Sequence, residues 1–246
     1  LKAQDASELP QRVEQALNRL SGEGELGLAT TEGRLRQELS QSLPEVFQRY
    51  QACLEEWPDV LDTSFRVRLE AATEAGNLAL DDLLPSRRTN PAGEQAQIVI
   101  TRGDLLKGSQ RKSYHYRNML EGWLQHLAAQ IAYPVGQYSL GHCEGSRVTT
   151  VLIGRTTSVR WAPMEAAIAR ERLTAVLQSW FVGMCQPLPV TISLASAWFE
   201  GLGRKHDEDR AWQQFEQAVE AAYARDPGYL QRGWPQPQQL IETAGG

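Results

Sequence analysis

Apolar residues recur at helical spacing in several stretches of the chain. Side chains three or four positions apart on one face predict amphipathic helices at residues 10–20, 42–57, 114–131, 164–184 and 207–223, with a shorter helix at 195–202. The second helix is expected to begin at Ser42, because Ser42 and Glu45 have the spacing of a capping box, and to end before Pro58. Much of the chain is therefore predicted to be helical.

After Asp62 the period changes from helical to alternating. Four apolar residues, Phe65, Val67, Leu69 and Ala71, alternate with charged ones and predict a half-exposed strand. A turn at 75–77 leads into a second strand that pairs back on the first and ends near Leu83, and residues 85–94 are expected to form a loop. Further strands in the same sheet are expected at 97–101, 138–140, 148–153 and 157–161. This order predicts an α/β (α+β) fold with a central mixed sheet flanked by helices.

The charge distribution divides the chain into parts. Residues 1–62 carry 12 acidic and 6 basic side chains, whereas the remainder carries 18 and 19. We therefore expect an acidic N-terminal helical segment (1–62), a core with C-terminal helices (63–234), and an irregular tail (235–246) that follows from its prolines. Since the acidic helices would repel a phosphate backbone, they are expected to lie away from any DNA path or to cover the core.

The composition is that of an ordinary globular protein, with 41% hydrophobic residues and a net charge of −5. No apolar run approaches the ~20 residues that a bilayer helix needs, and no secretory signal is visible, so we expect a cytoplasmic protein without membrane contact. The start at Leu1 is that expected of a piece of a longer chain. The three cysteines are odd in number and far apart, which argues against a disulfide framework or a zinc site.

Few residues carry recognisable chemistry. The four histidines lack partners at ligand spacing, and nucleotide, hydrolase and zincin motifs are absent, so no cofactor and no metal are expected. His126 is interpreted as a packing residue, with a catalytic base as the alternative. The clear basic cluster lies in residues 101–117 and consists of Arg102, Lys107, Arg111, Lys112 and Arg117. It is either a phosphate-contacting patch or a solvated surface.

Two adjacent carboxylates, Asp81 and Asp82, lie on the second predicted strand and point to opposite faces. A strand with an aspartate, a turn, an apolar strand and a long helix resemble the core of PD-(D/E)xK nucleases. That resemblance implies that Asp81 or Asp82 occupies the position of the first metal-binding aspartate of these nucleases, as a vestige of the active site. The acidic-x-Lys triplet falls in Val99–Arg102, which has no carboxylate, so the metal triplet is missing and metal binding should be very weak.

Several short sequence segments, in a fixed order along the chain, resemble the C-terminal domain of the exodeoxyribonuclease V gamma subunit, RecC. They are Gly122–Leu127, Gly183–Leu188, Ala197–Phe199, Ala211–Phe215 and Tyr229–Trp234. The resemblance runs over most of residues 10–234 and is weakest over 1–62. It implies a degenerate nuclease-like domain without a catalytic residue.

The function implied by this resemblance is that of a non-catalytic structural and DNA-guiding domain in double-strand-break repair and recombination. Its expected partners are RecB-like and RecD-like subunits, double-stranded DNA ends and unwound single strands. Two alternatives stay open. One is an active Mg-dependent nuclease in which Glu94 or Glu121 replaces the missing carboxylate, and the other is a protein-interaction module without nucleic-acid contact.

Overall fold

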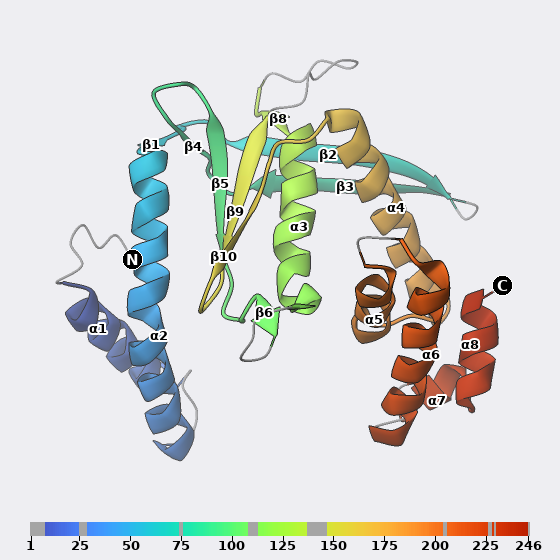
Figure 1. Cartoon of the computed structure of the whole chain (residues 1–246). Helices are drawn as coiled ribbons and strands as arrows, with labels where there is room; N and C mark the ends of the chain where they lie inside the picture. The colour runs from blue at the N-terminus through green and yellow to red at the C-terminus, as the bar shows by residue number, and fades with distance from the viewer. Residues whose placement is uncertain are drawn as a thin grey trace.

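The computed structural model describes residues 8–24, 29–73, 76–107, 113–136, 147–203, 206–225, 228 and 230–245. It is a mixed α/β fold, as predicted, in which helices flank a five-stranded mixed sheet (Figure 1). The helices are α1 (Leu9–Gly22), α2 (Ala29–Glu56), α3 (Tyr116–Ile131), α4 (Ala166–Cys185), α5 (Ile192–Leu202), α6 (Glu208–Arg225), α7 (Leu230–Gly233) and α8 (Pro237–Gly245). None of these described helices combines the length and apolarity needed to cross a membrane.

The five-stranded sheet has the strand order β1-β4-β5-β9-β10. Its strands are β1 (Asp59–Val60), β4 (Arg88–Thr89), β5 (Gln95–Ile100), β9 (Val148–Ile153) and β10 (Ser158–Trp161). The parallel pair β5–β9 is connected through α3, and the other pairs are antiparallel. The strands predicted at 148–153 and 157–161 are thereby confirmed, whereas the stretch 138–140 lies outside the described residues.

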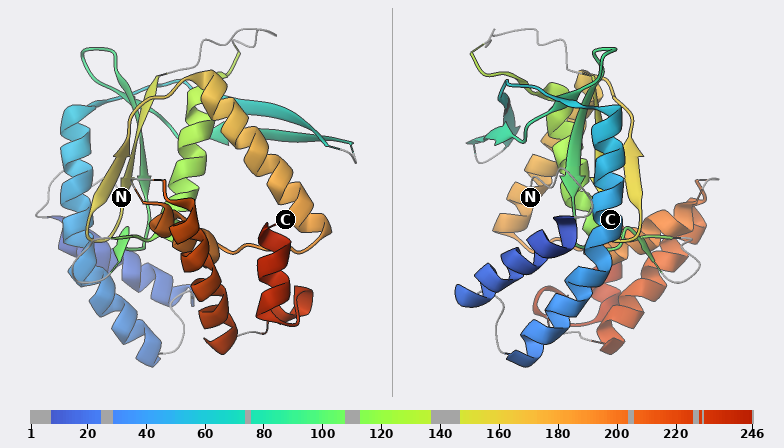
Figure 2. Two further views of the ribbon diagram at one scale, coloured as in Figure 1. Left: turned by 45° about the vertical axis from the view of Figure 1, so that its right-hand side comes forward. Right: turned by 90° about the vertical axis from the view of Figure 1, so that its left-hand side faces the viewer.

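Both faces of the β5–β9 pair are covered, because α2 lies on one side and α3 on the other (Figures 1 and 2). Ala96 and Val151 pack with Cys53 of α2 and with Trp57, which follows that helix, while Val99 and Leu152 pack beside α3. Alternation of side chains along a strand sends neighbouring residues to opposite covers. The burial of Cys53 on the apolar stripe of α2, which raises the pKa of its thiol, agrees with a packing role.

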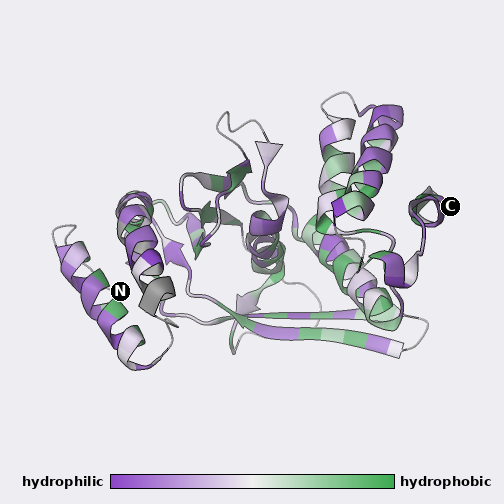
Figure 3. Ribbon diagram, turned by 90° about the horizontal axis from the view of Figure 1, so that it is seen from below, coloured by the Kyte–Doolittle hydropathy of each residue, from purple (hydrophilic) through white to green (hydrophobic). Residues whose placement is uncertain are grey.

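The predicted hairpin is present but belongs to a second sheet. β2 (Phe65–Thr73) pairs with β3 (Gly76–Leu84) on one side and with β8 (Tyr133–Pro134) on the other. Its alternating apolar and polar residues are visible as coloured bands in Figure 3. The inner residues of β2 pack on α3 and α4, not on the five-stranded sheet. The expectation that this hairpin shares a sheet with the later strands is therefore wrong.

Arg87 joins the two sheets from within the stretch predicted to be a loop. Its side chain is fully buried, with Nη2 donating to the Ala129 carbonyl at 2.8 Å and Nη1 donating to Gln95 Oε1 at 3.1 Å. The guanidinium also lies 3.7 Å from the ring centroid of Phe65. Burial lowers the pKa of Arg87 to about 10. The segment 85–94 is thus a packed connection that contains β4, and not a plain loop.

The predicted start of a helix at Ser42 is wrong, because α2 runs through this position with Pro44 inside it. Ser42 Oγ donates to the Glu38 carbonyl at 2.9 Å and so does not cap free amides. Pro44 removes one backbone hydrogen bond. The helix continues because Leu43 and Phe47 pack against α1. Tertiary packing on this side overrides the local start signal.

The C-terminal helices form a module of their own, residues 192–245. Its core joins residues of α5, α6, α7 and α8 with Trp234, which lies between α7 and α8. The members are Leu194, Phe215, Val219, Leu230, Trp234, Leu240 and Ile241. The predicted irregular tail at 235–246 is wrong: α8 covers Pro237–Gly245 and buries Leu240 and Ile241. Pro237 is the first residue of α8, where its missing N–H has no intrahelical partner to lose.

Candidate nucleic-acid interface

Three of the five predicted basic residues lie in described parts of the chain, and Arg111 and Lys112 lie outside them. Arg102 is exposed just after β5, and Arg117 is exposed in the first turn of α3. Lys107 ends β6 (Leu106–Lys107), which pairs with β7 (Ser113–Tyr114). Its Nζ lies 3.0 Å from Glu200 Oε1 of α5. The fold therefore connects the basic segment to the C-terminal module.

Lys107 and Arg117 line one hollow between the start of α3 and the start of α5. This hollow has a volume of about 420 Å³ and is completed by His115, Tyr116, Thr191, Ile192, Ser193 and Ser196. A second hollow of about 680 Å³ shares Tyr116, Ile192 and Ser196 with it and continues along α3 and α5. The second is lined mainly by Met119, Leu120, Trp123, Trp161, Ala195, Phe199 and Leu202. Together they form what we call the α3–α5 groove, with one basic and one apolar half.

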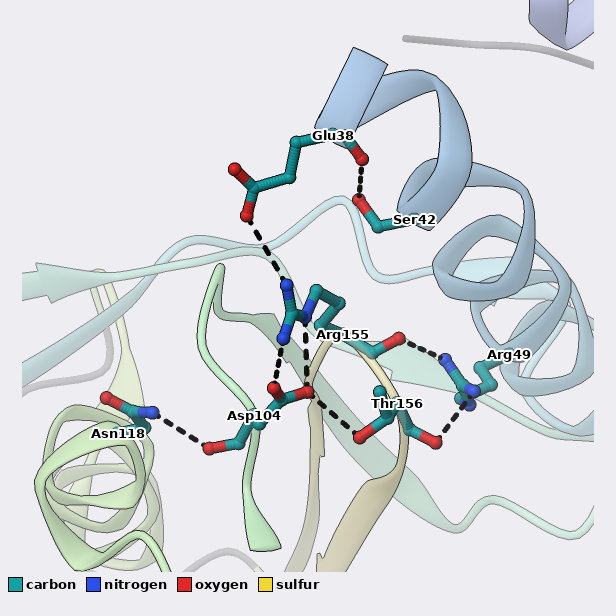
Figure 4. Close-up of polar contacts among 7 residues, drawn as sticks. All are labelled: Glu38, Ser42, Arg49, Asp104, Asn118, Arg155 and Thr156. Carbon is teal, nitrogen blue, oxygen red and sulfur yellow. Dashed lines mark hydrogen bonds and ion pairs between the residues drawn. The ribbon is translucent and has the colours of Figure 1, made fainter. Parts of the chain in front are cut away.

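Asp104 organises the loop that carries the basic residues. Its carboxylate accepts hydrogen bonds from Arg155, including one from Nε at 3.2 Å, and from Thr156 Oγ1 at 3.0 Å. The hydrogen bonds from Arg155 hold the pKa of Asp104 below its usual range. The backbone carbonyl of Asp104 accepts from Asn118 Nδ2 of α3 at 2.8 Å. Figure 4 shows how these contacts connect the loop to α3 and to the β9–β10 turn.

The same turn is held by α2 (Figure 4). Arg49 donates to the carbonyls of Arg155 and Thr156 at 2.9 and 2.8 Å, and Arg155 Nη1 lies 3.3 Å from Glu38. We refer to Asp104, Arg155, Thr156, Arg49 and Glu38 as the Asp104 cluster. No local pattern in the sequence indicates it, since Arg155 and Asp104 are 51 positions apart. The cluster fixes the loop after β5 relative to both covering helices.

Asp81 and Asp82, the two candidates for a vestigial position, are exposed on the hairpin. Asp81 forms two hydrogen bonds with Arg66, at 2.6 Å from Nε and 2.7 Å from Nη2, and these lower the pKa of its carboxyl. Asp82 Oδ1 accepts from the backbone N–H of Leu83 at 2.8 Å. The apolar strand β5 is in the other sheet, so Asp81 is not on a strand next to residues 99–102. Asp81 is engaged in an ion pair at this place in the fold.

The two carboxylates considered as replacements have their own local contacts. Glu94 accepts from Asn90 Nδ2 at 2.8 Å, and Glu121 accepts from Gln125 Nε2 at 3.4 Å. Among the described residues, no group of three or more His, Cys, Asp or Glu side chains could hold a metal ion.

His126 is buried beneath the groove and packs as predicted. Its ring contacts those of Trp123 and Trp161, at centroid distances of 5.3 and 5.9 Å, and the two tryptophan rings are themselves 5.7 Å apart. Nδ1 is 2.9 Å from Thr150 Oγ1 of β9. Burial lowers the pKa of His126 to about 4, so the imidazole is neutral near pH 7. The histidine therefore supports the floor of the groove and has no exposed surface from which to act as a base.

The geometry defines a mixed α/β domain with a basic and aromatic groove and, in its described part, without a metal-binding cluster. The sequence profile of the RecC C-terminal domain matches residues 1–203. The chain therefore belongs to the RecC C-terminal domain family, as the resemblance predicted. The segments Ala211–Phe215 and Tyr229–Trp234 lie beyond the matched residues. RecC is a subunit of exodeoxyribonuclease V, and this membership indicates a gamma-subunit role in DNA repair.

The other comparisons add little. A search of curated proteins returned no significant match. A solved structure titled "Crystal structure of SSO0001" is 12% identical, with 72% of this chain and 79% of that chain covered and a TM-score of 0.28. At this TM-score the likeness carries no argument. The family assignment rests on the profile match.

Proposed function

We propose that this domain is a non-catalytic, DNA-guiding and subunit-docking part of a RecC-type gamma subunit, in the cytoplasm. The match of the family profile to residues 1–203 carries the proposal. Its partners are then RecB-like and RecD-like subunits, DNA ends and unwound strands. The domain is then expected not to cut DNA, to contact DNA strands and to dock partner subunits.

The absence of catalysis is supported by the chemistry of the hairpin and the following strand. Asp81 is held by Arg66, and residues 99–102 supply no carboxylate that could join it. Phosphodiester cleavage in this class requires carboxylates that hold a metal ion and position water. A nuclease assay with Mg²⁺ should find no cleavage of single-stranded or duplex DNA. Cleavage that disappears in Asp81→Ala would contradict this part of the proposal.

The guiding role is supported by exposed cations after β5 and at the start of α3. Arg102 and Arg117 are exposed, and the segment between β6 and β7 adds Arg111 and Lys112 in the sequence. In the assembled complex, Arg102→Ala, Arg111→Ala and Lys112→Ala combined should weaken forked-DNA binding. Removing one protein–phosphate interaction should reduce the salt slope of the binding constant by about 0.9. An unchanged affinity and slope with normal assembly would favour the interaction-only alternative.

The docking role is supported by the second half of α4. Residues 173–199 contain no charged side chain, yet Val176, Trp180 and Met184 are exposed. An apolar helix end of this kind normally packs against another surface. We assign it to a partner subunit. Hydrogen-exchange mass spectrometry should show increased protection of residues 174–185 when the beta and alpha subunits are added. Unchanged exchange there in an assembled complex would move docking to another surface.

A further inference from the structure

Three aromatic side chains form a continuous row beside the basic half of the α3–α5 groove. The rings of Tyr114 and Tyr116 have centroids 6.1 Å apart, and those of Tyr116 and Phe199 are 6.4 Å apart. The row crosses from β7 over the start of α3 to α5. Tyr114 is 44% exposed and Phe199 is 58% exposed. Exposed rings that do not complete a core are available to a ligand.

The charged side chains that line the α3–α5 groove are positive. Among the described residues that line the α3–α5 groove, the cations are Lys107 and Arg117, and none is an aspartate or glutamate. The carboxylate of Glu200, which follows Phe199 in the chain, pairs with Lys107 at 3.0 Å. The cations therefore stand at one end of an uncharged aromatic surface. An apolar peptide would leave them unused, whereas a phosphate backbone would not.

Aromatic side chains in a row with neighbouring cations match the chemistry of single-stranded nucleic acid. Bases stack on aromatic rings with little dependence on sequence, and phosphates interact with lysine and arginine. A duplex cannot present unstacked bases to the row. We propose that the aromatic row Tyr114, Tyr116 and Phe199 binds one unwound DNA strand, with its phosphates on Lys107 and Arg117. This rests on the proposed function and names the site at which a strand is guided.

The ion pair between Lys107 and Glu200 allows a second, independent test of this proposal. Glu200 partly neutralises Lys107, so a bound phosphate has to compete with it. Removing the carboxylate in Glu200→Gln should strengthen strand binding, by about two- to fivefold for a partly exposed pair. A surface that binds an apolar protein segment has no reason to respond in this direction. The sign of the Glu200→Gln effect therefore separates the two occupants.

The test measures fluorescence anisotropy of a labelled oligothymidine with this chain at increasing salt concentrations. Phe199→Leu keeps apolar bulk but removes the ring, and it should weaken binding about 5- to 100-fold. Phe199→Trp keeps a ring and should bind like the wild type. Lys107→Ala should reduce the salt slope by about 0.7. Because Phe199 is exposed on α5, these substitutions should leave the fold intact, which circular dichroism checks.

Three results would overturn the proposal: no binding of oligothymidine by the wild type, equal affinity of Phe199→Leu and wild type, or weaker binding by Glu200→Gln. Its failure would be distinct from a failure of the proposed function. Co-purification with the beta and alpha subunits reports on the gamma-subunit role, and it does not depend on the aromatic row. Absence of strand binding with intact co-purification would discard the row and keep the docking role.

Discussion

The α/β body, which comprises β1–β10 with α2, α3 and α4, and the C-terminal module of residues 192–245 are held together in different ways. In the body, polar contacts join residues far apart in sequence, such as Arg155 and Glu38, which are 117 positions apart. In the module, apolar residues between Leu194 and Ile241 form one core. The profile match ends at residue 203, within the loop after α5. The body is thus stabilised by contacts between residues far apart in sequence, and the module is stabilised by packing between neighbouring helices.

This difference can be tested first where the largest effect is expected. Phe215 is 4% exposed in the module core and stacks on Trp212 at 5.3 Å. Phe215→Ala should destabilise the module by about 3–5 kcal/mol, because it leaves a cavity. Hydrogen-exchange mass spectrometry should show faster exchange in residues 208–245 and unchanged protection of β5 and β9. An equal decrease of protection in β9 would mean that the two regions unfold as one unit.

The buried His126 should make the stability of the body depend on pH. The folded chain keeps His126 neutral with a pKa of about 4, whereas an unfolded histidine titrates near 6.5. Between these values the unfolded chain binds a proton that the folded chain excludes, so stability falls as the pH is lowered from 6.5 to 4, by about 3 kcal/mol. Urea denaturation at several pH values measures it. His126→Gln should flatten this slope, and an unchanged slope would assign it to another group.

The Asp104 cluster should contribute less to the free energy of unfolding than the module core does. Its contacts, however, join residues that are farther apart in sequence. Asp104→Asn weakens the contacts to Arg155 and Thr156, and it should cost about 1–2 kcal/mol because the pair is partly exposed. Since the folded pKa of Asp104 lies below the unfolded one, this stabilisation is present above about pH 4 and disappears as the pH falls further. Urea denaturation should show that decrease in the wild type and not in Asp104→Asn.

A matched substitution on the hairpin gives the smallest expected effect. Asp81→Asn also removes a carboxylate held by two arginine hydrogen bonds, but Asp81 and Arg66 are on neighbouring strands and exposed to solvent. Solvent screening makes such pairs weak. The urea midpoint should move less than in Asp104→Asn. A larger shift of the urea midpoint in Asp81→Asn would contradict the view that the body is stabilised by contacts between residues far apart in sequence and not by every ion pair alike.

Periodicity along the chain predicted α1, the second half of α2, α3, α4, α5, α6 and the two strands of the hairpin, but not α7 or α8. Local signals failed where distant packing decides the outcome. The capping signal at Ser42 is overridden by contacts of α2 with α1, and Pro237 begins a helix whose apolar residues find the module core. The hairpin lies in a second sheet, and only its packing on α3 and α4 shows this.

The candidate site was partly predictable. Lys107 and Arg117 were visible as a basic cluster because they are close in sequence, and the fold places both in one groove. The aromatic row could not be predicted, since Tyr116 and Phe199 meet only when α5 folds back on α3. The Asp104 cluster was hidden for the same reason. Nothing in the local sequence around Asp104 points to its partner on the β9–β10 turn.

The most direct test of the gamma-subunit role is co-purification of this chain with candidate beta and alpha subunits. We predict that the chain is recovered with at least one of them, and that Trp180→Asp on the exposed apolar end of α4 reduces recovery. Phe199→Leu, which alters the aromatic row, should be recovered like the wild type. Failure of the folded wild-type chain to co-purify with either subunit would contradict the proposed docking role.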